Sequence, residues 1–163
     1  VRVSPTVIAG TSDSSGHFTP AANRTTTRVI SEDTAVKLRI MMESVVTANG
    51  TAPSAAIPGY RVAGKTGTAQ RYDSKTGRYS GYTASFIGFA PADAPRYVMS
   101  VTLQDPKNGH FGGALGGPVF KKVMTFVLQS KHVPPTGTKV LPVALNKSEL
   151  KRTNATSIAA KKQ

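Results

Sequence analysis

The chain has 163 residues, 39% of them hydrophobic, which suits one domain with a core of its own rather than two large domains. Lysine and arginine outnumber aspartate and glutamate by 21 to 8, a net charge of +13. Two interpretations of this charge stay open: a solvated basic surface with a basic tail, which is favoured, or an anionic partner such as nucleic acid, an acidic membrane face or anionic wall polymer. The absence of cysteine excludes disulfides, thiolate nucleophiles and cysteine-based zinc sites, and no apolar run approaches the roughly 20 residues that cross a bilayer.

The first regular element that the sequence predicts is a helix. It follows residues 1–30, which are rich in threonine, serine, glycine and proline and are expected to be irregular. Ser31 is a typical N-cap, and the two acidic residues behind it suit the positive end of a helix dipole. Asn49-Gly50 predicts a left-handed stop. Apolar residues at spacings of three and four predict one buried face, made of Ala35, Leu38, Met41, Met42, Val45 and Val46.

Three strands and a second helix are predicted next. After a proline-containing loop the hydrophobic period changes to two, which predicts strands over residues 60–71, 82–90 and 96–104. The short link between the last two strands has the length of a hairpin loop. A glycine-rich loop then leads to Pro118, which suits the first turn of a helix. The core side of that helix is predicted to be Val119, Phe120, Val123, Met124, Val127 and Leu128.

These elements predict an α+β fold, an antiparallel sheet of about three strands with flanking helices. Both edges of such a sheet are open, which indicates that part of the structure is missing. We assign residues 1–130 to the folded domain. Residues 131–163 form a basic tail of proline, threonine, lysine and alanine, which we expect to be disordered.

Residues 59–81 carry three overlapping signals. Read from Gly59, the stretch matches the phosphate-loop pattern G-x-x-x-x-G-K-[ST], but no apolar strand precedes it and no helix pattern follows it, so we do not expect a nucleotide site. The tripeptide Lys-Thr-Gly occurs twice, at Lys65-Thr66-Gly67 and at Lys75-Thr76-Gly77. Turn-forming residues flank the second copy, which is therefore predicted to be a hairpin turn.

The first copy lies in strand sequence. Alternation places Lys65 and Gly67 on one face and Thr66 and Thr68 on the other, while the glycines leave room for another backbone or a ligand. An ammonium group, hydroxyl donors and an exposed amide suit a carboxylate or a developing oxyanion. From the residues alone, two interpretations stay open: an anion-binding strand, or a charged edge strand without a site.

The segments GYRVAGKTGTAQR, YSGYTASFIGFAP and GHFGGALGGPVFKKVM give the stretch its family likeness. In order and spacing, about residues 1–130 resemble the C-terminal half of the transpeptidase domain of penicillin-binding proteins. The likeness is greatest to the class B, division-associated enzymes of actinobacterial type, and Lys65-Thr66-Gly67 stands where the third family motif stands. The resemblance implies an incomplete part of the serine β-lactamase and penicillin-binding transpeptidase fold.

The resemblance also implies a role for each residue of the strand. Lys65 would supply positive field and proton-network support near the nucleophile. The hydroxyls of Thr66 and Thr68 would bind the carboxylate of a D-alanyl-D-alanine stem peptide or of a β-lactam, and the backbone N–H of Thr68 would form half of the oxyanion hole. Gly67 would leave room for substrate to lie antiparallel to the strand.

Two family motifs, Ser-x-x-Lys and Ser-x-Asn, are absent upstream of Lys65. Ser148-Glu149-Leu150-Lys151 spells the first, but it follows the third motif and lies in the basic tail, so we do not assign it as the nucleophile. The chain is therefore expected to be an inactive fragment of a serine-type transpeptidase. The resemblance further implies a location at the outer face of the bacterial cytoplasmic membrane, through an upstream anchor. The implied partners are the missing N-terminal part and cell-division membrane proteins.

Two other classes of function compete with this one. A noncatalytic domain could use the same strand and basic surface to bind wall polymer or a partner protein. Nucleic acid is not expected as a partner, because only 7% of the residues are aromatic and they form no stacking platform among the basic residues. His17, His110 and His132 lack the spacing of metal ligands, so we expect neither a metal nor a cofactor.

Overall fold

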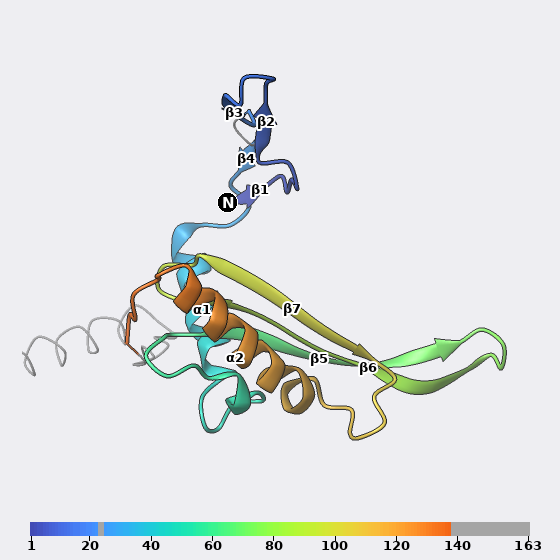
Figure 1. Ribbon diagram of the computed structural model, residues 1–163. Helices are drawn as coiled ribbons and strands as arrows, with labels where there is room; N and C mark the ends of the chain where they lie inside the picture. Colours follow the sequence, from blue (N-terminus) through green and yellow to red (C-terminus); the bar gives the residue numbers. More distant parts are fainter. Residues whose placement is uncertain (23–24, 138–163) are drawn as a thin grey trace, which may run out of the picture. The chain divides into compact units, whose positions relative to one another are not determined.

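A computed structural model describes residues 1–22 and 25–137 of the chain (Figure 1). The chain divides into two compact units, Val1–Val36 and Lys37–Gln163. The first unit, predicted to be irregular, contains two short antiparallel strand pairs, β1 with β4 and β2 with β3. Their bounds are Arg2–Val3 (β1), Gly10–Ser12 (β2), Phe18–Pro20 (β3) and Thr26–Thr27 (β4).

Helix α1 spans Glu32–Ser44 and begins where the sequence predicts. The Thr34 N–H donates to Ser31 Oγ at 3.1 Å, so Ser31 caps a backbone donor that has no partner inside the helix. The N-cap prediction is confirmed.

The predicted end of α1 at Asn49-Gly50 is wrong, because the helix stops at Ser44. The Ser44 hydroxyl donates to the Met41 carbonyl at 2.6 Å, and the Thr47 hydroxyl donates to the Ser44 carbonyl at 2.7 Å. Side-chain hydroxyls thus satisfy carbonyls of the last turn, and the helix ends without a left-handed glycine.

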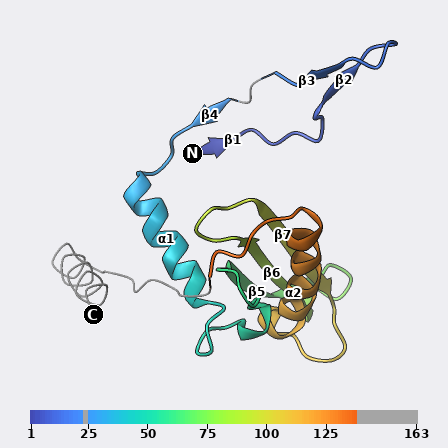
Figure 2. The same cartoon turned by 60° about the vertical axis from the view of Figure 1, so that its left-hand side comes forward.

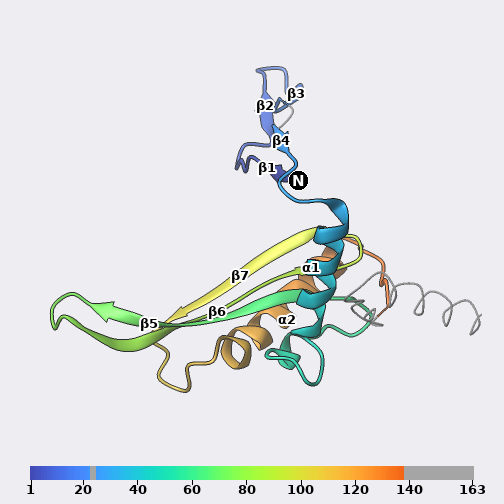
Figure 3. The ribbon, with the colours of Figure 1, turned by 180° about the vertical axis from the view of Figure 1, so that it is seen from behind.

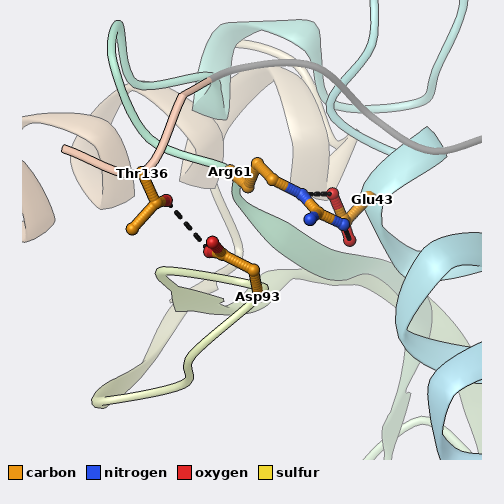
Figure 4. A network of polar contacts seen from close by, with 4 residues as sticks. All are labelled: Glu43, Arg61, Asp93 and Thr136. Carbon is orange, nitrogen blue, oxygen red and sulfur yellow. Dashed lines mark hydrogen bonds and ion pairs between the residues drawn. The ribbon is translucent and has the colours of Figure 1, made fainter. Parts of the chain in front are cut away.

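The predicted apolar face of α1 is only partly buried. Val46 is 7% exposed, but Leu38 and Met41 are each 44% exposed, whereas Glu43 is fully buried. The predicted core side consists of apolar residues only, and a carboxylate is rarely buried without a partner. In the structure Arg61 is that partner (Figure 4).

The second unit contains the predicted sheet, and the antiparallel meander is confirmed. Its strands are β5 (Ala63–Asp73), β6 (Arg78–Ala90) and β7 (Tyr97–Gln104), in the order β5-β6-β7. Among the described residues, β5 and β7 are therefore open edges. Figure 3 shows that the β5–β6 hairpin runs on past the end of β7, which pairs with β6 only from Thr83 to Ala90.

Helix α2 spans Gly112–Ser130 and covers one face of this sheet (Figure 2). The predicted start at Pro118 is wrong, because the glycine-rich stretch before it is already helical. Glycine disfavours a helix interior, but here it allows close packing on β6. A Cβ on Gly116 would lie 2.9 Å from Phe86 Cβ, and one on Gly112 would collide with the Ser85 carbonyl oxygen.

The core lies between α2 and the sheet. Phe86 of β6 meets Phe120 of α2 edge to face, with ring centroids 5.0 Å apart, and both side chains are fully buried. Such an aromatic pair adds stabilisation beyond the apolar area that it removes from water. This aromatic pair therefore packs β6 against α2.

Replacing Gly116 by alanine tests whether packing dominates this helix. Propensity alone favours alanine by about 1 kcal/mol, whereas the contact with Phe86 predicts a net loss of about 1–3 kcal/mol in the free energy of unfolding. Thermal and urea unfolding of the complete protein measure the difference. As a control, Ala114, which is exposed on the same helix, should lose stability when replaced by glycine. A more stable Gly116→Ala protein would contradict the packing argument.

The segment that follows α2 packs within the second unit. Val133 is 8% exposed within the core, and its carbonyl accepts a hydrogen bond from the Tyr60 hydroxyl at 2.7 Å. The Thr136 hydroxyl donates to Asp93 at 2.9 Å (Figure 4). The predicted disordered tail lies outside the described residues from position 138 onward, and the boundary after residue 130 stays a prediction.

Candidate functional site

Strand β5 places the predicted site residues on two opposite faces of the sheet. Thr66 is paired with Phe86, whose side chain packs under α2, so Thr66 lies on the helix-covered face. Thr68 shares that face, since side chains alternate along a strand. Lys65 is paired with Ile87 and lies on the other face. The predicted alternation of cation and hydroxyls is confirmed.

Lys65 is exposed, and its Nζ donates to the Thr66 carbonyl at 2.8 Å. Its neighbour across the strand pair, Ile87, is 49% exposed, and Val98 is 73% exposed on the same face. The described residues therefore leave this sheet face open around the ammonium group.

Gly67 has a packing role within the sheet. It pairs with Ser85 of β6, and a Cβ at Gly67 would collide with the Ser85 hydroxyl. Gly64 is similar, because a Cβ there would meet the ring of Phe86. Packing within the sheet therefore requires glycine at positions 64 and 67, in addition to the substrate access that the resemblance implies for Gly67.

The two hydroxyls of the strand each meet a polar group from another segment. The Gly112 N–H, at the start of α2, donates to Thr68 Oγ1 at 3.3 Å. Thr66 Oγ1 lies 3.2 Å from Thr51 Oγ1. A hydroxyl whose oxygen accepts a hydrogen bond keeps its own hydrogen to donate. Thr68, which accepts the helix N–H, can therefore donate to an acceptor outside the protein.

Thr51 and Gly112 were not predicted as part of this site. Thr51 lies in the proline-containing loop, and Gly112 lies in the glycine-rich stretch that the sequence pattern assigned to a loop. Neither has a local signal that connects it to residues 65–68. Only the packing of α2 and of the loop against β5 brings them together.

The second Lys-Thr-Gly copy is the turn of the β5–β6 hairpin, as predicted. Asp73 accepts hydrogen bonds from the Lys75 N–H at 2.9 Å and from the Thr76 hydroxyl at 3.0 Å, and Gly77 has a φ of 65°. The N–H of Lys75 also lowers the pKa of the Asp73 carboxyl, because it favours the charged form. These contacts define a turn and place this copy away from the first.

The phosphate-loop pattern has no matching structure. Gly59 lies in a turn with a φ of 81°, and Lys65 and Thr66 lie in a strand, not at the start of a helix. The backbone N–H groups of a helix N-terminus are what such a loop needs to hold phosphate. The prediction that no helix begins at Lys65-Thr66 is confirmed.

The described residues contain no group of three or more histidine, cysteine, aspartate or glutamate side chains placed to hold a metal ion. His110 instead stacks on Tyr82, with ring centroids 4.5 Å apart. Within residues 1–22 and 25–137, neither helix is long and apolar enough to cross a bilayer.

Known proteins have sequences similar to that of this chain. Residues 1–125 match the family described as the penicillin binding protein transpeptidase domain. A probable peptidoglycan D,D-transpeptidase PenA of Neisseria flavescens is 46% identical over 112 residues, which cover 67% of this chain and 28% of the relative. Penicillin-binding protein PbpB of Mycolicibacterium smegmatis is 40% identical over 144 residues, which cover 82% of this chain and 22% of the relative.

Solved structures share the fold. Penicillin-binding protein 3 of Mycobacterium tuberculosis, complexed with ampicillin, superposes with a TM-score of 0.75 at 34% identity, over 89% of this chain and 34% of that one. The transpeptidase domain of Burkholderia pseudomallei penicillin-binding protein 3 gives 0.63 at 42% identity, over 77% and 38%. The chain thus spans well under half the length of each relative. On sequence and fold together, it belongs to the transpeptidase domain family of the class B penicillin-binding proteins.

Proposed function

We propose that this chain contributes one wall of the active site in a peptidoglycan D,D-transpeptidase, which cross-links stem peptides through an acyl-serine intermediate and is acylated by β-lactams. One observation carries the proposal. An open edge strand holds Lys65 on an exposed sheet face and two threonine hydroxyls beside the start of a helix. A peptide can align along such an edge and meet hydrogen-bond donors there.

Lys65 is the catalytic cation of this proposal. An ammonium group on an open sheet face stabilises negative charge on a group that reacts above that face. The exposed neighbours Ile87 and Val98 form an apolar surface around it, which a further layer of protein would remove from water. Once water is excluded, the same charge acts more strongly.

Thr66 and Thr68 bind the substrate carboxylate in this proposal. The oxygen of Thr68 accepts the Gly112 N–H, so the positive end of the α2 dipole polarises the Thr68 hydroxyl toward an anion. A carboxylate accepts such charge-assisted hydrogen bonds strongly. The oxyanion-hole role of the Thr68 N–H and the substrate space at Gly67 belong to the same proposal. The relative from Mycobacterium tuberculosis was crystallised with ampicillin and with aztreonam.

The rest of the protein completes the site in this proposal. This chain covers 34% of the Mycobacterium tuberculosis structure. In the sequence of this chain, no Ser-x-x-Lys motif precedes Lys65. We assign the nucleophilic serine, its general base and the cover of the open sheet face to the remaining part. Residues 1–130 then form the C-terminal portion of the transpeptidase domain, followed by the basic tail. An upstream anchor holds the enzyme at the outer face of the cytoplasmic membrane, where division proteins are its partners.

A fluorescent penicillin tests this proposal. The complete protein is expected to be labelled covalently, whereas the isolated 163-residue chain is expected to stay unlabelled, because it lacks the nucleophile. Denaturing gel electrophoresis separates covalent labelling from reversible binding, and heat-denatured complete protein controls for nonspecific reaction. Labelling of the isolated chain would overturn the assignment of the serine. Salt-sensitive binding of the complete protein to wall polymer, without labelling, would support the noncatalytic alternative instead.

A further inference from the structure

We infer that Thr51 is a positioning residue for the substrate-binding hydroxyl of Thr66, an inference that rests on the proposed function. Thr51 lies between α1 and the short 3-10 helix η1 (Pro53–Ala55), and its Oγ1 is 3.2 Å from Thr66 Oγ1. Nothing in the local sequence connects the two threonines, which are 15 residues apart. Their contact comes from the folding of the loop against β5.

The backbone around Thr51 is held on two sides. The N–H of Ala52, a fully buried residue, donates to the Val45 carbonyl at 2.8 Å. On the other side, α2 approaches so closely that a Cβ on Gly113 would collide with the Thr51 carbonyl oxygen and lie 3.0 Å from Thr66 Cγ2. The Thr51 side chain itself is exposed. A fixed backbone therefore holds the exposed Thr51 within hydrogen-bond distance of the Thr66 hydroxyl.

The direction of the hydrogen bond decides what Thr66 can do. A hydroxyl has one hydrogen to donate, and Thr66 can donate it to a carboxylate only if it is not given to Thr51. When Thr51 donates to Thr66, the Thr66 oxygen is occupied and its hydrogen points to the ligand. Each hydrogen bond in such a chain strengthens the next.

Thr68 shows the same arrangement with a different donor. Its oxygen accepts the Gly112 N–H at 3.3 Å, which leaves its hydrogen for a ligand. Both hydroxyls on this face of β5 thus have a protein partner: a backbone N–H that donates to Thr68 and a side-chain hydroxyl that, by this inference, donates to Thr66. An anion bound by both fixes the direction of the Thr51 hydrogen bond, and bonds of this kind tighten when substrate binds.

The test uses the complete enzyme and the second-order rate constant of acylation by a penicillin and by its methyl ester. Replacing Thr51 by valine is expected to slow acylation by the free acid about 5- to 10-fold, the effect of losing one hydrogen bond to a charged complex. Acylation by the ester, which lacks the negative charge, should change much less. Thr51→Ser keeps the hydroxyl and should restore the rate with the acid. Thr47→Val is the matched control, since the Thr47 hydroxyl donates only to the nearby Ser44 carbonyl.

The outcomes separate this inference from the proposed function. If Thr66→Val abolishes the preference for the free acid and Thr51→Val leaves that preference unchanged, the positioning role is wrong and the proposed function stands. If Thr66→Val keeps the preference, the proposed carboxylate site is wrong. An equal loss with acid and ester for Thr51→Val would show a purely structural effect and overturn the inference. The inference also predicts that the double variant Thr51→Val with Thr66→Val is acylated no more slowly than Thr66→Val alone. Thr51→Ala against Thr51→Ser gives the same comparison if the valine variant does not fold.

Discussion

Replacing Lys65 by alanine in the complete enzyme is expected to slow acylation by roughly 10²- to 10⁴-fold, whereas the same replacement of Lys75 is expected to leave it nearly unchanged. Both lysines begin a Lys-Thr-Gly sequence and belong to one hairpin. They differ in place: Lys65 lies within β5 on the open sheet face, and Lys75 lies in the turn. Lys75→Ala is thus a matched control for composition and for general loss of charge.

The rate of covalent labelling by fluorescent penicillin, measured at several penicillin concentrations, gives the acylation rate constant. Thermal unfolding of the Lys65→Ala and wild-type proteins checks that the variant folds, so that a slower reaction reports the loss of the ammonium group. Lys65→Arg keeps the positive charge but not the compact ammonium group, and is expected to recover part of the rate. Equal rates for Lys65→Ala and Lys75→Ala proteins would contradict the assignment of the first copy as the active one.

The prediction of β5, β6 and β7 from the sequence succeeded because their signals are local. An alternating pattern identifies a strand, and the turn residues around Lys75 identify a hairpin. The start of α2 was missed because its cause is not local: the glycines become helical through contacts with Phe86 and Ser85 of β6. A pattern along one segment carries no information on such approaches between segments.

The candidate site was likewise only partly predictable from the sequence. Alternation along β5 placed Lys65 opposite the two threonines, as the structure has them. The hydrogen-bond partners of the threonine hydroxyls, Thr51 and the Gly112 N–H, come from other segments and have no sequence pattern of their own. Residues that only orient a site are therefore harder to predict from one sequence than residues that form its strand.

Glu43 is the clearest failure of sequence pattern in this chain. Its side chain is fully buried, although it lies in a helix whose apolar residues were predicted to face the core. Arg61 binds it through two hydrogen bonds of 2.8 and 2.7 Å, and this contact raises the pKa of the Arg61 guanidinium (Figure 4). The pairing partner is 18 residues away, so the helical period alone does not reveal it.

The Glu43–Arg61 pair also positions the strand that carries the site. The Arg61 carbonyl accepts the Ala92 N–H at 2.7 Å, and β5 begins at Ala63. The pair thus joins the end of α1 to the residue that leads into β5, while the loop between β6 and β7 binds the same residue from the other side. Its loss would affect the placement of Lys65 as well as stability.

Replacing Glu43 by leucine is expected to lower the free energy of unfolding by about 3–5 kcal/mol, because it leaves the Arg61 guanidinium, whose side chain is only 13% exposed, without its acceptor. The double variant Glu43→Leu with Arg61→Met removes both charges and should recover most of that loss, since a buried ion pair gains little over apolar residues of similar size. Thermal and urea unfolding of the complete enzyme measure both.

A matched control replaces Lys107, which pairs with Asp105 on the surface where its side chain is 83% exposed, by alanine. Water screens that pair, so the unfolding temperature should not change measurably. If the double variant is as unstable as Glu43→Leu, apolar side chains cannot substitute for the ion pair. Its directed hydrogen bonds, rather than the cost of an unpaired buried charge, would then be what holds α1 against the strand of the active site.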